Sequence, residues 1–600
     1  MKEGLIKITR LSGFRYGLVF LFCLALSMIS NYSVYAQEKD LELSLDPNSA
    51  TIALPEIFKP NMDLSGRGFH PKESWPQELA AQEVLDIWQK DIGFNGIYRL
   101  QYDLWNINQL AKDKDMQEKL LGNYESIIKK ISDSGGIVIL SLFGTPAGLG
   151  KVLDKRSPPW DRGALKELIK GHIRYLSCQK KYNIWYEVWN APDLEDFFLG
   201  KKIEYFLIYR IVAESVKELE AETKIHILVG GPSVSSWFQN LNGNTILRPE
   251  NSLVYELIKF CYRNHLPLDF ISWHSYSTDP KIEKEATVYK KTTVNLIRDW
   301  LSFFHFERNI PLIIDEWNYD RYGNILAERK EKAYIAASYI PARLKEMYRA
   351  GINYQLYFCL EDFQNNFAGV TRNTGAFWFD SESGEYKGGY KCIYNLFRML
   401  YSLGNKFFTS LPKLDDEFVG IIATRGDDYL AIMVYNYLDP DIARNYLSRN
   451  ISGLSGSEIK SILDFIQTRK LDKIVNNEIK IDSLRVSARE KALLNKAKEL
   501  NMRYLKFKAT TRNLKLGIKN LKRNYLYQRY IIDSSCSLDC EFAPLEKKEL
   551  GPTDLYQETL VLSPYSTQLI ILKEKAKEPE AVTPIAGELP ANKDTSKSNS

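Results

Sequence analysis

Residues 184–193 read IWYEVWNAPD, a short apolar run that ends in polar residues and a proline. An amphipathic stretch precedes it at 166–179, and another follows at 202–220. An apolar run of four to eight residues between two helical patterns is typical of a fully buried strand. The stretch therefore predicts a strand–helix unit with polar groups at the carboxyl end of the strand.

The same unit recurs from about residue 64 to 405. The other expected strands are 96–100, 137–142, 225–229, 270–274, 312–315 and 354–359, and one near 66–69 completes eight. Helical patterns lie between them at 76–90, 123–134, 253–264, 286–305 and 333–350. Alternating strands and helices imply a parallel sheet, and eight units predict an α/β fold of the (β/α)8 TIM barrel type. An open doubly wound sheet is the alternative, although no Gly-rich phosphate loop follows an early strand.

The pattern changes after residue 405, where short alternating runs are separated by turn residues. The expected strands are 419–424, 429–437, 504–509, 514–518, 525–533 and 560–572, and helical patterning interrupts them at about 440–500. We interpret this region as an antiparallel β-sandwich domain. The predicted organisation is a signal peptide at 1–36, a barrel at 37–408, a sandwich with a helical insertion at 409–575, and a disordered tail at 576–600.

The first 36 residues have the composition of a secretory signal. Four basic residues precede the apolar run 17–29, and Val34-Tyr35-Ala36 is typical of a cleavage site. The run has about 13 residues, fewer than the roughly 20 that a membrane-spanning helix needs. We expect a secreted or periplasmic protein without a membrane span, cleaved near Ala36; an uncleaved anchor is the alternative.

Cysteine use and charge limit the classes of partner. Cys536 and Cys540 are close enough to form a disulfide after export, and the other cysteines that follow the leader lie in apolar segments. Their spacing fits no metal site, and we expect no cofactor. The region 485–529 holds 14 Lys and Arg against two Glu, within a chain of net charge +5. This region is either a solvated face or a surface for an anionic polymer, and we expect no nucleic acid to bind an exported protein.

Functional groups of a (β/α)8 barrel lie at the carboxyl ends of its strands. These ends carry Arg99 on the second strand, Trp189-Asn190-Ala191-Pro192 on the fourth, His274-Ser275-Tyr276 on the sixth and Glu316-Trp317-Asn318 on the seventh. The set resembles the retaining glycosidases with barrel folds, and in detail family 39, the β-xylosidase and α-L-iduronidase group. Lys387-Gly388-Gly389-Tyr390 and the strand 525–533 extend the resemblance to the last barrel helix and the sandwich.

The resemblance implies a reaction with two carboxylates about 5–5.5 Å apart, one attacking the anomeric carbon and the other acting as acid and base. Glu316 matches the nucleophile, and His274 and Tyr276 match residues that contact sugar and orient it. Asn190 matches the asparagine that binds the 2-hydroxyl, and Arg99 matches a buried arginine behind the nucleophile. Trp189 and Trp317 remain open between core packing and sugar platforms. Glu187 matches a glutamate deeper in the barrel.

The acid/base position departs from the family pattern, because Ala191 stands where Trp-Asn-Glu-Pro has its glutamate. General acid/base catalysis typically contributes about 10²–10⁴-fold, so the loss bears directly on activity. Asp193, Glu195 and Asp196 on the same loop, and Glu361 and Asp362 after the eighth strand, are candidate replacements.

Three interpretations follow. The first is a retaining glycoside hydrolase acting on an oligo- or polysaccharide with its acid relocated or missing. The second is a carbohydrate-binding pseudoenzyme of cell-envelope polysaccharide processing. The third is a structural envelope protein held through 485–529.

Overall fold

The structure is a computed structural model of the chain. It describes residues 41–66, 78–109, 114–237, 249–285, 291–319, 332–365, 370–372, 374–380, 387–411, 414, 416–451 and 454–575. The predicted signal peptide and tail lie outside these ranges. Within them, no helix is both long and apolar enough to cross a bilayer.

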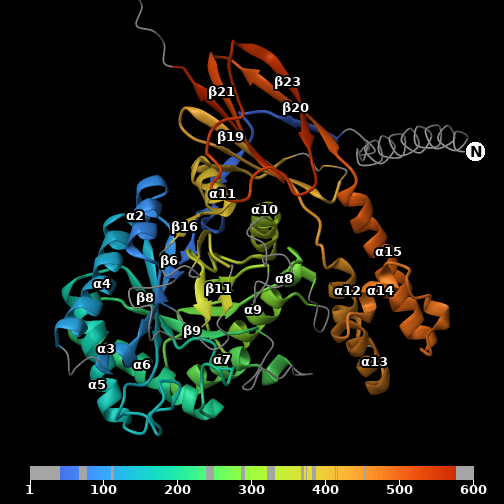
Figure 1. Cartoon of the computed structure of the whole chain (residues 1–600). Helices are drawn as coiled ribbons and strands as arrows, with labels where there is room; N and C mark the ends of the chain where they lie inside the picture. Colours follow the sequence, from blue (N-terminus) through green and yellow to red (C-terminus); the bar gives the residue numbers. More distant parts are fainter. Residues whose placement is uncertain are drawn as a thin grey trace, which may run out of the picture.

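Eight parallel strands close into a barrel, shown in the lower part of Figure 1. In chain order they are β3 (Met62–Asp63), β6 (Ile97–Asp103), β7 (Ile137–Phe143), β8 (Ile184–Val188), β9 (Leu228–Val234), β10 (Phe270–His274), β11 (Leu312–Trp317) and β12 (Tyr354–Tyr357). Because β12 pairs with β3, the sheet has no free edge. The barrel prediction is confirmed, and the open-sheet alternative is wrong.

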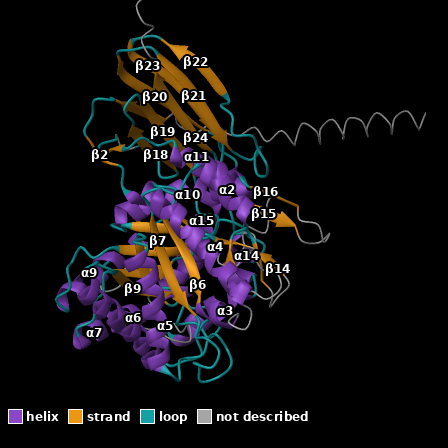
Figure 2. Ribbon diagram, turned by 90° about the vertical axis from the view of Figure 1, so that its left-hand side faces the viewer, coloured by secondary structure: helices purple, strands orange, loops and turns teal. Residues whose placement is uncertain are grey.

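Helices cover the outside of the barrel (Figure 2). They are α2 (Gln82–Asp91), α3 (Leu104–Gln109), α4 (Lys114–Asp133), α5 (Arg162–Ile173) with the π-helical turn Arg174–Gln179, α6 (Lys202–Thr223), α7 (Leu253–Asn264), α8 (Ile282–Glu285), α9 (Thr293–Phe303), α10 (Ala333–Ala350) and α11 (Cys392–Tyr401). Strands between a packed interior and a helical layer are buried on both faces, which explains why β8 is buried along its whole length.

Two barrel strands differ from the sequence prediction. The first strand is β3 at 62–63, whereas the prediction placed it near 66–69, of which 67–69 lie outside the described residues. The apolar signal of β3 is short, because Asn61 and Asp63, both buried, interrupt it. The fifth strand is β9 at 228–234 rather than 225–229. Gly230, Gly231 and Pro232 lie inside it, and these residues normally indicate the end of a strand.

The second domain is a sandwich of two sheets. One sheet has the order β1 (Leu41–Leu45), β20 (Arg512–Leu521) and β23 (Thr553–Leu562). The other has the order β2 (Thr51–Ala53), β17 (Lys406–Phe408), β18 (Val419–Arg425), β19 (Tyr429–Asn436), β24 (Thr567–Glu574), β21 (Tyr525–Ile532) and β22 (Glu546–Leu550). Leu43, Leu516, Ile432 and Ile570 belong to the apolar cluster of this domain. The sandwich prediction is confirmed, with β1 and β20 as a parallel pair.

The boundary between the two domains differs from the prediction at both ends of the barrel. Residues 41–53 precede the barrel in sequence but form strands of both sandwich sheets, and β17 at 406–408 also belongs to the sandwich. The predicted strand 504–509 is instead the end of α15 (Ala488–Lys508). Its apolar residues alternate as in a strand, but it continues an unbroken helical pattern, and Phe507 packs against Tyr565.

The helical insertion lies beside the barrel on the right of Figure 1. It consists of α12 (Ile442–Asn450), α13 (Gly456–Gln467), α14 (Lys470–Val475) and α15. Leu447, Ile462, Ile474 and Leu494 form a small apolar core of its own. This segment, which lies between β19 and β20 in the sequence, therefore forms a compact unit with its own core.

Short hairpins and a disulfide complete the fold. The hairpins pair β4 (Ser65–Gly66) with β5 (Glu78–Leu79), β13 (Phe363–Asn365) with β14 (Val370–Arg372), and β15 (Phe377–Asp380) with β16 (Lys387–Tyr390). Cys536 and Cys540 form the predicted disulfide. Their loop contacts the barrel, since Asn395 on α11 donates to the Cys540 carbonyl at 2.8 Å.

Candidate active site

Arg99 is the centre of a buried polar network inside the barrel. Its side chain comes from β6 and is fully buried. Nε lies 2.8 Å from Glu187 Oε2, and Nη1 lies 3.0 Å from Asp63 Oδ2. Nη2 donates to Asn190 Oδ1 at 2.8 Å. One guanidinium thus connects the first, second and fourth strands of the barrel.

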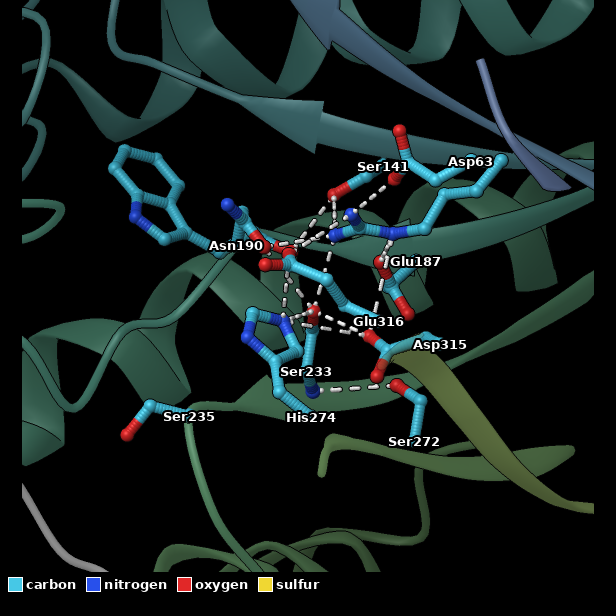
Figure 3. A network of polar contacts seen from close by, with 12 residues as sticks. Asp63, Ser141, Glu187, Asn190, Ser233, Ser235, Ser272, His274, Asp315 and Glu316 are labelled. Atoms are coloured by element: carbon cyan, nitrogen blue, oxygen red, sulfur yellow. Dashed lines mark hydrogen bonds and ion pairs between the residues drawn. The ribbon is translucent and has the colours of Figure 1, made fainter. Parts of the chain in front are cut away.

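Glu316 lies at the end of β11, on the open side of this network. Its Oε1 accepts a hydrogen bond from the Tyr276 hydroxyl. Its Oε2 lies 3.4 Å from His274 Nε2 and 3.6 Å from Arg99 Nη1. Figure 3 shows Glu316 and Asn190 near each other, with His274 beside them. The structure therefore brings together the five residues predicted from the sequence.

Two buried polar atoms of this group have no hydrogen-bond partner among the described residues. They are Glu316 Oε2 and Asn190 Nδ2. Both side chains lie against the same guanidinium, and Glu316 remains 7% exposed. Buried polar atoms are normally paired, so an unpaired donor and an unpaired acceptor on side chains that share one guanidinium are candidates to bind a polar ligand such as a sugar hydroxyl.

The ionisation of the network follows from its burial. Burial alone would lower the pKa of Arg99, but neighbouring negative charge, that of Glu187 first, holds it well above its ordinary value. Burial would likewise raise the pKa of Glu187, and the charge of Arg99 instead holds it below its ordinary value. Asp315 behaves differently, because burial and the neighbouring Glu187 together raise its pKa well above the usual range. Asp315 is therefore neutral when Glu187 is ionised.

Ser233 is part of the site, and we did not predict it. It follows Pro232 at the carboxyl end of β9, and its hydroxyl lies 3.1 Å from Arg99 Nη2 and 3.2 Å from His274 Nε2. The signal was present in the sequence as a polar residue ending the fifth strand. The predicted strand ends at residue 229 and does not include Ser233. Asp63 lies outside the strand predicted near 66–69, and Asp315 ends the predicted strand 312–315, where the next residue, Glu316, carries the site prediction.

Ala191, the residue that the resemblance places at the acid/base position, is almost fully buried. Its φ of 43° places it in the left-handed region, and its N–H donates to the Ser233 carbonyl at 2.9 Å. The methyl group offers no proton. The sharp turn after β8 thus has a defined conformation but lacks the carboxyl group expected there.

The nearby candidate carboxylates on the same loop have other roles. Asp193 is fully buried, and its Oδ1 accepts from the Ser235 N–H at 2.9 Å while its Oδ2 accepts from the Ser235 hydroxyl. This pair ties the loop after β8 to the end of β9. Glu195 and Asp196 are exposed on the loop surface.

The candidates after the eighth strand are also engaged. Glu361 is fully buried, and its Oε2 accepts from the Ala81 N–H at 3.0 Å, at the start of α2. Asp362 forms a buried ion pair with Lys391 at 2.7 Å. Both carboxylates therefore have stabilising contacts away from Glu316.

The two tryptophans that flank the site belong to the core. Trp189 packs against Phe143 with ring centroids 5.1 Å apart, and its indole N–H donates to the Phe197 carbonyl at 3.1 Å. Trp317 is fully buried and donates to Gln355 at 2.6 Å. Of the two interpretations left open by the sequence, core packing is the one that the structure shows for both.

Comparison with known proteins gives a family resemblance. A sequence model described as "Glycosyl hydrolases family 39" matches residues 150–437, which include Asn190, His274 and Glu316. The chain resembles the family 39 glycoside hydrolases. This match supports a glycosidase-like protein.

Individual relatives match parts of the chain. The β-xylosidase of Caldicellulosiruptor saccharolyticus is 34% identical over 121 residues, which cover 20% of this chain and 21% of that protein. The β-xylosidase of Geobacillus stearothermophilus is 26% identical over 199 residues, 30% of this chain and 36% of that protein. The chain thus spans about a fifth to a third of the length of these curated relatives.

The likeness in fold extends further than the likeness in sequence. A solved family 39 enzyme from Xanthomonas axonopodis pv. citri superposes with a TM-score of 0.58 at 15% identity, covering 90% of this chain and 98% of that one. At this identity the match describes the fold alone. The barrel and the sandwich are therefore both shared with that structure.

Proposed function

We propose that the protein binds an oligo- or polysaccharide at the carboxyl end of the barrel and attacks its anomeric carbon with Glu316. The observation that carries this proposal is the pair of unpartnered atoms, Glu316 Oε2 and Asn190 Nδ2, beside one buried guanidinium. Tyr276 holds the other oxygen of Glu316. Glu316 Oε2 has no hydrogen-bond partner among the described residues and lies 3.4 Å from His274 Nε2, so we assign it as the attacking oxygen.

The reaction has two halves, and Ala191 affects them differently. Formation of the glycosyl–Glu316 ester needs a proton on the leaving oxygen unless the leaving group is already a stable anion. Hydrolysis of the ester needs a base to take a proton from water. We therefore expect an activated aryl glycoside to react with Glu316, after which the ester persists.

The test uses 2,4-dinitrophenyl glycosides, beginning with the xyloside because the matched relatives are named β-xylosidases. We expect a burst of dinitrophenolate equal to the enzyme concentration, then slow turnover, and a mass increase on the peptide that contains Glu316. Azide needs no base, so it should accelerate turnover and give a glycosyl azide of retained configuration.

Three variants make the test specific. Ala191→Glu should raise hydrolysis of unactivated glycosides by about 10²–10⁴-fold. Ala191→Gln is the matched control, similar in size but unable to transfer a proton, and should not. Glu316→Gln should abolish the burst. Rapid hydrolysis of unactivated glycosides by the unaltered protein would show that another group supplies the proton.

The second candidate function is a carbohydrate-binding pseudoenzyme in cell-envelope polysaccharide processing, favoured by Ala191 itself. It predicts that sugars bind to the unaltered protein while neither azide nor Ala191→Glu produces any turnover. Calorimetric titration with oligosaccharides, run beside the kinetic assays, distinguishes the two functions.

Acidic side chains pair with some of the 14 Lys and Arg of the region 485–529. The pairs include Lys491–Asp482, Lys496–Glu499, Arg512–Asp416, Lys522–Asp554 and Arg529–Glu546. These acids offset only part of the positive charge, so a surface for an anionic polymer stays a prediction. We propose carbohydrate in the barrel as the ligand.

We also propose that the protein is exported, with cleavage near Ala36. This rests on the basic start and the short apolar run of residues 1–36. Amino-terminal sequencing of protein recovered outside the cytoplasm should begin near Gln37. Recovery of material that still begins at Met1 would contradict it.

A further inference from the structure

Ser233 connects the buried Asp315 with His274 and Arg99, a link that the proposed reaction does not use. Its hydroxyl oxygen is fully buried and lies 2.5 Å from Asp315 Oδ2, 3.2 Å from His274 Nε2 and 3.1 Å from Arg99 Nη2. A hydroxyl has one proton to donate and two lone pairs that accept. The acceptor of its single donated hydrogen bond therefore determines whether His274 Nε2 donates a hydrogen bond to Ser233 or accepts one from it.

Asp315 and Glu187 determine that acceptor. Burial and the charge of Glu187 raise the pKa of Asp315, so we assign the proton of this pair of acids to Asp315. Asp315 Oδ1 is the oxygen without a hydrogen-bond partner among the described residues, and we place the proton there. Asp315 Oδ2, which lies 2.5 Å from the Ser233 hydroxyl, then accepts, as it also would in an ionised carboxylate.

The remaining bonds follow by elimination. With Asp315 Oδ2 accepting, the Ser233 proton is donated to it, and the two lone pairs of Ser233 receive the Arg99 N–H and a proton from His274 Nε2. Asn190 Oδ1, at 3.5 Å from Ser233, already accepts from Arg99 at 2.8 Å. The ring nitrogen that carries the proton is therefore Nε2, the nitrogen that lies 3.4 Å from Glu316 Oε2.

We propose that Asp315 and Ser233 are positioning residues that fix His274 in the tautomer with its proton on Nε2, directed at Ser233 and at the attacking oxygen of Glu316. In this arrangement His274 orients Glu316 Oε2 from one side while Tyr276 holds Oε1 from the other. Asp315, the residue before Glu316, thus acts on His274 through two hydrogen bonds, Asp315–Ser233 and Ser233–His274, and His274 in turn orients Glu316.

The test reads the tautomer directly from the ¹⁵N spectrum of histidine-labelled protein at neutral pH. The chain has six histidines, and the loss of one signal set in His274→Gln assigns the residue. We expect Nε2 of His274 to carry the proton and Nδ1 to be unprotonated. A proton on Nδ1 only, or on both nitrogens, in the unaltered protein would overturn the proposal. The assignment requires that His274→Gln folds, and unchanged signals of the other five histidines would show that it does.

Variants at Asp315 test the cause. Asp315→Asn retains a donor toward Glu187 and an acceptor toward Ser233, so the tautomer should remain. Asp315→Val removes the acceptor, which frees the Ser233 proton to turn to His274 Nε2 and should move the ring proton to Nδ1. Asp63→Asn is the matched control, another buried carboxyl beside Arg99 without contact to Ser233, and should not change the tautomer. An unchanged tautomer in Asp315→Val would overturn the proposal.

A kinetic readout connects the tautomer to the proposed function, on which this part rests. Glu316 is labelled with a 2-deoxy-2-fluoroglycosyl fluoride and followed by mass spectrometry. Asp315→Val should slow labelling by about tenfold or more, as expected for loss of a hydrogen bond to a charged group, and Asp315→Asn should stay within about threefold of the unaltered protein. If the unaltered protein is not labelled, the proposed nucleophile is wrong, whereas the tautomer in the spectrum still decides the inference.

Discussion

Replacing Arg99 by methionine tests whether the polar network depends on one cation. Methionine keeps much of the length of the side chain but removes the charge that faces Glu187 at 2.8 Å and Asp63 at 3.0 Å. Both carboxylates are buried, and removing one partner of a buried pair costs about 3–5 kcal/mol because the other charge is left uncompensated. We expect a loss of that size at pH 8.

The loss should shrink on acidification. In the unaltered protein Arg99 holds the pKa of Glu187 low, so the stability from this pair is present at neutral pH and lost only as the pH falls through that low value. Without Arg99, burial raises the pKa of Glu187 in the folded state. The folded variant then binds a proton at a pH where the unfolded chain does not, and it gains stability as the pH falls.

Urea unfolding followed by tryptophan fluorescence measures this difference in the barrel. All eleven tryptophans precede residue 379 and none lies in the sandwich strands β18–β24, so the signal reports the barrel domain. Lys129→Met is the control, since its pair with Asp133 is more than half exposed on α4 and should cost under about 1 kcal/mol. A loss below about 1 kcal/mol for Arg99→Met, or an equal loss at pH 5 and pH 8, would refute the reasoning.

Three further predictions concern other contacts. Burial and the neighbouring Asp279 raise the pKa of Asp439 to about 7. Between about pH 4 and pH 7 the folded state therefore binds a proton that the unfolded chain does not, and the stability should fall as the pH rises through this range. Asp439→Asn should flatten this slope in thermal unfolding, and an unchanged slope would contradict the prediction. Replacing Cys536 and Cys540 by serine opens a loop of separation 4 and should cost about 2 kcal/mol of unfolding free energy in urea titrations; an equal midpoint would show that the loop is held by its contacts alone. Asn190→Ala should weaken oligosaccharide binding by about 2- to 10-fold in calorimetry, the value of one neutral hydrogen bond, and unchanged affinity would remove Asn190 from the binding site.

The parts of the site that sequence reasoning found share one property. Glu316, His274 and Tyr276 lie at the ends of strands with strong apolar runs, so their place at the mouth of the barrel followed from local pattern and topology. Ser233 and Asp63 lie where the strand signal is weak, because glycine and proline interrupt β9 and polar residues interrupt β3. Local patterns could not locate them.

Two segments differ from the prediction because local sequence patterns do not report tertiary packing. The segment 504–509 alternates like a strand but is helical, since packing of Phe507 against Tyr565 outweighs a six-residue preference. Residues 41–53 precede the barrel in sequence, yet β1 pairs with β20 more than 460 residues later. Pairing over such a distance depends on which sheet edge is open, and no short stretch of sequence carries that information.

The sequence by itself determined the barrel, the sandwich and the resemblance to family 39 glycoside hydrolases, because apolar periodicity indicates which faces are buried and the ends of parallel strands meet at one edge. It also determined that position 191 has no ionisable side chain, since alanine cannot transfer a proton in any fold. Only the tertiary structure decided how Arg99, Asp315 and Ser233 connect to Glu316. Whether two buried groups form a hydrogen bond depends on differences of a few tenths of an ångström in the distance between them. The closure of eight strands into one barrel sets these distances.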